Sequence, residues 1–407
     1  MMRTPVVLLL AVVFLAAAGV GGWVAADRLM GDDGGTGATP TPTSTRVSTA
    51  APTASGTPAA GGPALLYREF GSGADTLWLA PAASPTDRKS MAQIDHAPDW
   101  GISASLSPDG NLVAYLVLAN GSQDPDREAE AWVLDVHSGQ KRHLADGFDL
   151  RTRPVWSADS DAIVVGRNGP QADTGGEVSL VGVDVANGGE TVLGTEPNVL
   201  GLFPIGYSPA PEVGGALVFA RITLGGTDFG WLGAETPPVH ASDESARDYH
   251  LSPDGTRVAY LARQRTDGRI AMRAFVAELS PTATPKALST LASVLDAGDH
   301  FNPVWRDDDS VTVGRTPAAG ESSAAALLVP LEEGTVEEVG PGPEQGFDVP
   351  VAWSSDGRYL AVRSFEGSSA AQPGRERLTI IEEGSGRNAV GEQGSLEFIG
   401  WLPNGSR

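Results

Sequence analysis

The six residues SLSPDG at positions 105–110 return almost unchanged as HLSPDG at positions 250–255. In such a turn Pro presets φ at the second position, Asp bonds back to the backbone, and Gly accepts a positive φ. The runs that follow, LVAYLV at 112–117 and RVAYLAR at 257–263, are rich in apolar residues, so each turn is expected to join two strands. The pattern therefore predicts a β protein built from a repeated unit.

Weaker copies of this turn recur along the chain from residue 64 onward. Each copy begins with an apolar or aromatic lead residue, and successive lead residues are 44 to 54 residues apart. A period of this length with about four strands per unit is typical of β-propeller blades. The lead tryptophans are expected to pack one blade against the next. The lead residues are Leu106, Trp156, Tyr207, Leu251, Trp305, Trp353 and Trp401.

The two ends of the repeat region complete each other. FIGW at 398–401 is a first strand, whereas ALLYREF at 64–70 and DTLWLAP at 75–81 are a second and a third strand with no turn before them. The C-terminal strand is therefore expected to join the N-terminal strands and close the ring. We predict an all-β, seven-bladed β-propeller. The alternative is six blades, because the unit led by Tyr207 lacks the Asp-Gly of the turn.

The turn sequence resembles that of the TolB-like, WD-repeat-like propellers. Pro108-Asp109-Gly110 and Pro253-Asp254-Gly255 match the P-x-W-S-x-D-G turn of that family at its end, and Trp353-Ser354-Ser355-Asp356-Gly357 nearly does. The resemblance covers residues 64–407, and it implies a fold used for protein docking and in non-catalytic domains of peptidases. TolB also carries an N-terminal α/β domain, which has no counterpart here, so the particular role of TolB is not expected of this chain.

The N-terminal part is divided differently. Residues 1–4 form a short cytoplasmic N-terminus, and residues 5–26 are uncharged and long enough for a transmembrane signal-anchor helix. Arg3 favours a cytoplasmic N-terminus. Residues 27–63, rich in Thr, Pro and Gly, are expected to be a disordered stalk, and residues 64–407 the propeller. The alternative is a signal peptide cleaved after Ala26, which would give a secreted protein.

Charge and cysteine content restrict the partners. The net charge is −23, and all of it falls on residues 64–407. Such a surface repels phosphate backbones, so no nucleic acid partner is expected. With no cysteine in the chain, disulfides, thiolate catalysis and lipid attachment to a cysteine are excluded. We expect a bacterial membrane protein with the propeller on the extracytoplasmic side, monomeric, bound to the membrane through its N-terminal helix, and without a cofactor.

The sequence contains few groupings typical of a catalytic site. The sequence has no G-x-S-x-G, H-E-x-x-H, P-loop or Rossmann fingerprint. His250 and His300 lie just before the turns of neighbouring units, with Asp248 and Asp299 near them. A His/Asp metal or acid–base site is conceivable there, and hydrogen bonding between blades is the expected role. We therefore predict neither a catalytic residue nor a metal site.

Arginine recurs at the end of the second strand. Arg167, Arg221 and Arg315 share one register, and Arg68 and Arg363 lie one residue earlier in two other units. All five should lie on one rim of the propeller, together with His250 and His300. An anion-binding face would use the guanidinium groups. The alternative is a ring of structural Arg–Asp pairs between blades.

Three functions follow from these observations. We expect a non-catalytic protein- or ligand-binding module, with a protein partner or a wall-associated ligand on one face. An extracellular enzyme that acts on glycans or peptides through carboxylates at the channel mouth is the first alternative. A sensor domain coupled to a membrane partner is the second. The identity of the partner has no signature in the sequence.

Overall fold

The computed structural model describes residues 62–169, 176–209, 215–234, 237–266, 269–280, 284–291, 293–295, 298–391 and 395–402. The predicted segments 1–4 and 5–26 lie outside these residues, and so does nearly all of 27–63. In the described part of the chain, no helix is long and apolar enough to cross a membrane.

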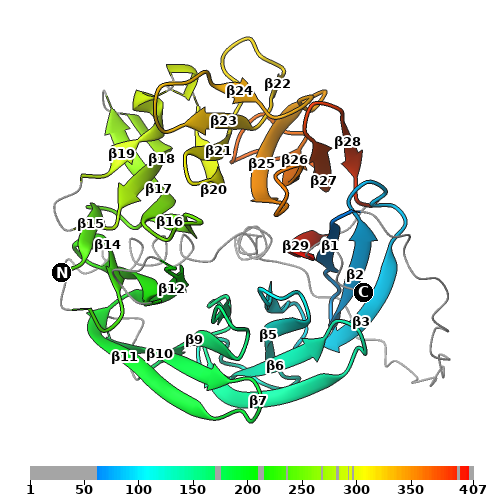
Figure 1. Cartoon of the computed structure of the whole chain (residues 1–407), viewed down its shortest axis with the longest axis vertical. Helices are drawn as coiled ribbons and strands as arrows, with labels where there is room; N and C mark the ends of the chain where they lie inside the picture. Colours follow the sequence, from blue (N-terminus) through cyan, green and yellow to red (C-terminus); the bar gives the residue numbers. More distant parts are fainter. Residues whose placement is uncertain are drawn as a thin grey trace, which may run out of the picture.

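Seven β-sheets stand as blades around a common axis, which confirms the predicted all-β, seven-bladed propeller (Figure 1). From the innermost strand outward, blade 1 consists of β29 (Leu396–Leu402), β1 (Ala64–Glu69), β2 (Ala74–Pro81) and β3 (Lys89–Asp95). Blade 2 consists of β4 (Ser103–Leu106), β5 (Leu112–Leu118), β6 (Ala129–Asp135) and β7 (Lys141–Phe148). Blade 3 consists of β8 (Val155–Trp156), β9 (Ala162–Asn168), β10 (Gly176–Asp184) and β11 (Glu190–Val199).

The second half of the ring repeats this order. Blade 4 consists of β12 (Gly201–Tyr207), β13 (Leu217–Thr223), β14 (Gly226–Trp231) and β15 (Val239–Ser242). Blade 5 consists of β16 (Arg247–Leu251), β17 (Arg257–Thr266), β18 (Arg269–Glu278) and β19 (Lys286–Ala287). Blade 6 consists of β20 (His300–Asp307), β21 (Ser310–Arg315), β23 (Leu327–Pro330) and β24 (Glu337–Glu338). Blade 7 consists of β25 (Gly346–Trp353), β26 (Tyr359–Phe365), β27 (Glu376–Glu382) and β28 (Gly386–Ala389).

Two features depart from four antiparallel strands per blade. β22 (Ser323–Ala324) pairs in parallel with β25 and gives that sheet a fifth strand. Between blades 5 and 6 lie two short 3-10 helices, η3 (Leu288–Thr290) and η4 (Ser293–Leu295). Blade 4, whose turn lacks Asp-Gly, is nevertheless complete, so the six-blade alternative is wrong.

The ring closes by antiparallel pairing of the chain's last strand with its first. β29 pairs with β1 from Ala64 opposite Leu402 to Glu69 opposite Leu396. Blade 1 therefore combines both ends of the repeat region, as the two sequence fragments predict. This pairing leaves neither of the two terminal strands with an unpaired edge toward the other, so the ring is closed.

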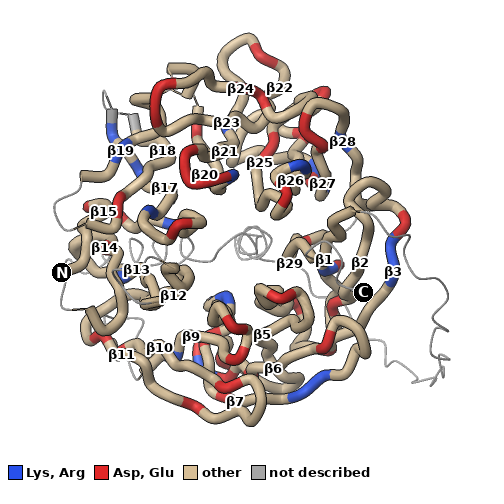
Figure 2. Tube along the Cα trace, in the orientation of Figure 1, with Lys and Arg blue, Asp and Glu red and all other residues tan. Residues whose placement is uncertain are grey.

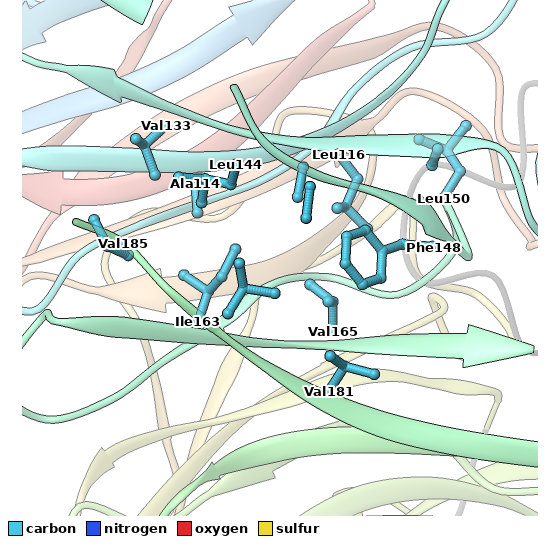
Figure 3. Packing of buried hydrophobic residues seen from close by; sticks show 14 of the residues in the cluster. Ala114, Leu116, Val133, Leu144, Phe148, Leu150, Ile163, Val165, Val181 and Val185 are labelled. Carbon is cyan, nitrogen blue, oxygen red and sulfur yellow. The ribbon is translucent and has the colours of Figure 1, made fainter. Parts of the chain in front are cut away.

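Each blade buries its apolar side chains against its neighbours. One cluster joins Leu116 and Phe148 of blade 2 to Ile163 and Val181 in blade 3 (Figure 3). Comparable clusters lie between the other pairs of blades. The lead residue Trp156 belongs to the cluster between blades 2 and 3, which confirms that it packs one blade against the next.

The turns between the first and second strands of blades 2, 3, 5 and 7 share one set of hydrogen bonds. Ser107 Oγ donates to Asp109 Oδ1 at 2.6 Å and accepts the Leu112 N–H at 2.9 Å. Ser354, Asp356 and Tyr359 repeat these bonds in blade 7. The serine and aspartate of the motif therefore fix the turn, and they lie on the face where the innermost strands end. This face is called the exit face below, and the opposite one the entry face.

Candidate functional site

Strand register places the predicted arginines on the entry face. His300, the first residue of β20, is the cross-strand neighbour of Arg315, and Val349 near the start of β25 is that of Arg363. The ends of the second strands therefore lie beside the beginnings of the innermost strands. Carboxylates are present around the whole ring rather than in one sector (Figure 2).

Arg68 belongs to a buried ion-pair network in the closing blade. Its Nη1 donates to Asp75 Oδ2 at 2.6 Å, and its Nε donates to Glu397 Oε2 at 2.8 Å. Asp75 is fully buried and also bonds His96 Nε2 at 3.1 Å. Because Glu397 lies on β29, this network connects the two ends of the repeat region.

Arg315 and Arg363 also have carboxylate partners within their own blades. Arg315 donates to Glu321 from both terminal nitrogens, at 2.6 and 3.2 Å. Arg363 Nη2 donates to Glu376 Oε2 at 2.9 Å. Both arginines are buried, whereas Glu321 is exposed and Glu376 is partly exposed, so each pair lies at the surface with its guanidinium inward.

Arg167 and Arg221 are more accessible and connect neighbouring blades. Arg167 pairs with Glu190 at 2.8 Å, and its guanidinium also donates to two backbone carbonyls of blade 2. Arg221 pairs with Asp228 in its own blade at 2.8 Å and with Glu196 of blade 3 at 3.3 Å. Most partners of the five arginines are thus glutamates, where aspartates were expected. Ligand binding by the five stays a prediction.

His300 is fixed by its backbone surroundings. It is fully buried; its Nδ1 accepts the Ala274 N–H at 3.0 Å, and its Nε2 lies 2.6 Å from Leu295 O. With Nδ1 as an acceptor and Nε2 as a donor, the ring is in one neutral tautomer. Both ring nitrogens therefore serve the junction between blades 5 and 6.

His250 has a different environment, on the next innermost strand. Its Nε2 lies 3.0 Å from Asn302 Oδ1, while Asn302 Nδ2 donates to Pro350 O at 2.6 Å. Burial lowers the pKa of His250, Asn302 and Asp248 raise it, and the positive charge of Arg153 lowers it. Among the described residues, neither His250 nor His300 belongs to a group of three or more possible metal ligands.

Arg153 was missed by the sequence reasoning. Its Nε donates to Ala104 O at 3.1 Å and its Nη2 to Ile399 O at 2.8 Å, on the innermost strands of blades 2 and 1. The repeat itself could have indicated this position, because Arg153-Pro154-Val155-Trp156 aligns with Asn302-Pro303-Val304-Trp305. Arg153 and Asn302 therefore occupy one register, three residues before the lead tryptophan.

That register forms one level of the ring, because each residue lies three positions before the lead residue, on an innermost strand or, for Arg153, just before one. Two of its residues have a positive φ, Asp248 at 54° and Asn302 at 32°. Irregular pairing accompanies both. Such β-bulges reorient side chains and are frequent at functional sites. The residues of this level are Ser103, Arg153, Pro204, Asp248, Asn302, Pro350 and Phe398.

A second grouping lies on blade 2, away from this level. Glu130, His143 and Asp146 offer ligand atoms within 4.8 Å of one another. His143 Nε2 lies 2.8 Å from Asp146 Oδ1, and Trp132 Nε1 donates to Glu130 Oε2 at 2.9 Å. The sequence did not indicate it, since irregular pairing between β6 and β7 brings these residues together. Existing hydrogen bonds account for the arrangement.

Comparison with known proteins identifies the repeat. The family model described as the lipoprotein LpqB beta-propeller domain matches residues 101–367. No curated protein matches the sequence. Together with the seven blades, the family match confirms the prediction of a TolB-like β-propeller protein.

Solved structures share the fold at low sequence identity. Acylaminoacyl peptidase of Pyrococcus horikoshii is 13% identical with a TM-score of 0.51, over 79% of this chain and 48% of its own. The propeller domain of the Trilobed protease from Pyrococcus furiosus, described as having an open velcro topology, is 10% identical with a TM-score of 0.50, over 82% and 97%. TolB from Acinetobacter baumannii is 14% identical with a TM-score of 0.45; the alignment covers 68% of this chain and 65% of TolB, less than two-thirds of its length.

Proposed function

Because the chain belongs to the family of the lipoprotein LpqB beta-propeller domain, whose model matches more than half of it, we propose that it is a non-catalytic binding module of a bacterial cell envelope. Its entry face would receive an envelope protein or a wall-associated ligand. The propeller would act as a rigid support, since binding residues are commonly presented by loops on such a scaffold.

One observation carries the choice of binding over catalysis. His300, the buried histidine at the start of an innermost strand, has both ring nitrogens bonded to backbone atoms. A general base needs a free lone pair within hydrogen-bonding reach of the substrate. This imidazole therefore supports the scaffold and is unsuited to proton transfer.

Carboxylates on the entry face give the same indication. Asp75 is paired with Arg68, and the fully buried Asp348 accepts from Arg387 at 2.9 and 3.0 Å. A glycosidase-type reaction needs a pair of carboxyl groups that can contact the substrate, whereas both of these carboxylates are occupied by guanidinium groups of the scaffold. An enzyme acting on glycans or peptides therefore remains the second candidate, favoured only by the peptidase relative of the same fold.

Location in the envelope rests on residues outside the described part of the chain. We propose that residues 5–26 anchor the protein and residues 27–63 hold the propeller away from the membrane. A lipid anchor is an unsuitable alternative because this sequence contains no cysteine. When membranes are washed with alkaline carbonate, the chain should stay in the membrane fraction. Release of the chain into the wash would indicate a cleaved signal peptide. A sensor role would require a membrane partner for the same helix.

The proposed function is tested with the tagged full chain as bait in cross-linked membranes. We expect one envelope component to be captured at near-equal amount, to be displaced by untagged chain, and to be released with its mass unchanged. A component that is released cleaved or otherwise altered would favour the enzyme. Failure to capture any component that untagged chain displaces would contradict a binding module.

A further inference from the structure

Arg153 joins the innermost strands of three successive blades. It precedes β8 of blade 3 and donates hydrogen bonds to carbonyl oxygens of β4 and β29, in blades 2 and 1. Its side chain is exposed to solvent although it contacts the innermost strands. A group with these neighbours that still meets water lies at the axial channel of the propeller.

The charge of Arg153 is not balanced by an ion pair. Both acceptors are neutral carbonyls, and no carboxylate of the described residues lies within ion-pair distance. Glu397, the acid that acts on it electrostatically, is already bound by Arg68. The five rim arginines, by contrast, each contact a carboxylate. Arg153 therefore keeps its charge available to a ligand.

The surroundings of Arg153 strengthen its interaction with an anion. Nε and Nη2 are partly buried where they bond the two carbonyls, and burial lowers the pKa of Arg153 whereas Glu397 raises it. A charge-assisted hydrogen bond from this partly covered group is stronger than one in open water. The two carbonyls also fix the orientation of the guanidinium, which reduces the entropy lost on binding.

His250 adds a polar group to the same region. Its pKa is lowered by burial and by Arg153, which favours the neutral ring. Asn302 donates its amide N–H to Pro350 O, so its Oδ1 must accept from His250 Nε2. Nδ1 of the neutral ring then keeps a lone pair that can accept a hydrogen bond from an N–H or O–H group of a ligand.

From this geometry we propose that Arg153 forms an anion subsite in the axial channel, which takes a single carboxylate group of the ligand. The inference rests on the proposed binding function and specifies its chemistry. A carboxylate carries one charge, which one guanidinium balances. A domain with a net charge of −23 repels a phosphate dianion about twice as strongly as a carboxylate monoanion, so the carboxylate is favoured.

Side-chain NMR of the full chain, labelled with ¹⁵N-arginine in detergent, tests the subsite. Arg153 Nε is identified by its loss in Arg153→Gln, and acetate is titrated to about 100 mM at constant ionic strength. Acetamide is the neutral isostere, chloride and inorganic phosphate are the competing anions, and Arg167, already paired with Glu190, is the internal reference. We expect acetate alone to shift the Arg153 signal saturably.

The titration is measured on the native chain, so its outcome does not depend on the stability of a variant. A shift at Arg153 no larger than at Arg167, or an equal response to acetamide, would overturn the subsite. A larger response to phosphate would overturn the choice of a carboxylate. If the captured envelope component carries the carboxylate, Arg153→Gln should weaken its binding at least about tenfold. Acetate binding without any captured component would leave the subsite intact and contradict the binding module.

Discussion

The indole N–H of Trp305 donates a 2.8 Å hydrogen bond to the backbone oxygen of His250 in the preceding blade. Trp156 makes the same bond to Ser105 O, and Trp401 to Ala352 O. In each case the acceptor is the residue immediately before the lead residue of the preceding blade. In these three blades the tryptophan is therefore both an apolar wedge and a hydrogen-bond donor that sets the relation of two innermost strands, whereas Trp353 donates to Thr312 Oγ1 on the second strand of blade 6.

Replacing Trp305 by Phe should lower the free energy of unfolding by about 1–3 kcal/mol, because the buried acceptor on His250 loses its donor. Denaturant unfolding followed by circular dichroism measures this. Trp100→Phe is the matched control, since Trp100 is 41% exposed and should change stability by less than about 0.5 kcal/mol. Equal effects of the two substitutions would contradict a structural role for the indole N–H.

The exit-face turns depend on a positive φ. Gly357 has φ 68°, and an added Cβ would meet nothing within 4 Å, so Gly357→Ala should cost about 1 kcal/mol from the backbone alone. Ser160 occupies the same turn position in blade 3 with φ 63°, and Ser160→Gly should be nearly neutral, because relief of the backbone cost offsets the loss of the 3.4 Å bond that its hydroxyl accepts from the Asp109 N–H. Gly386→Ala is the control, because that glycine also has open space and no positive φ. If the two alanine variants unfold at the same denaturant concentration, the backbone argument fails.

Asp75 balances the buried charge of Arg68 in the closing blade. Asp75→Asn keeps the shape of the side chain but removes its charge, and we expect a loss of about 3 kcal/mol in unfolding free energy. The exposed Asp87→Asn should be nearly neutral. The comparison uses denaturant midpoints at one pH. A midpoint for Asp75→Asn equal to that of Asp87→Asn would show that the network does not hold blade 1 together.

Acid should destabilise the turns. The hydrogen bond from Ser157 and then the Asp161 N–H lower the pKa of Asp159 below its ordinary value. In Asp109, burial raises the pKa but bonds from Ser107 and Asn111 lower it further. A lowered folded-state pKa gives stability above the ordinary value near 4, lost as the pH falls through the folded-state value.

Unfolding midpoints measured from pH 6 down to about pH 2 should therefore fall below about pH 4, less steeply in Asp159→Asn than in the native chain. Asp87→Asn serves again as the reference. An Asp159→Asn profile as steep as the native one would contradict the contribution of this turn.

Much of the fold follows from the sequence because the turn motif repeats. AIVVGR at 162–167 and SVTVGR at 310–315 correspond to β9 and β21, since β-branched strands between marked turns leave little choice of register. The spacing of the repeat predicted a fourth strand in each blade but not its first and last residues. Outermost strands such as β24 are short and exposed, so they leave no pattern of buried residues. The parallel pairing of β22 with β25 has no local signal at all, since it depends on how a loop returns to the sheet.

The site was less predictable than the fold. Repeat register placed Arg315 on the correct face, but its partner Glu321 lies in a loop outside the repeat. Arg153 contacts backbone oxygens 49 and 246 residues away in the sequence. Every residue has a backbone oxygen, so the sequence does not show which of them accepts a hydrogen bond. Only the assembled ring shows that Arg153 bonds carbonyls and has no carboxylate partner among the described residues.

Photo-crosslinking in living cells tests the central claim most directly, that the entry face is the binding surface. p-Benzoylphenylalanine replaces Trp100, an exposed residue in the loop that leads into β4, or Ala158, an exposed residue in the exit-face turn of blade 3. Under irradiation we expect a discrete adduct from position 100 and none from position 158. Adducts from position 158 alone, or equal labelling from both positions, would contradict binding on the entry face.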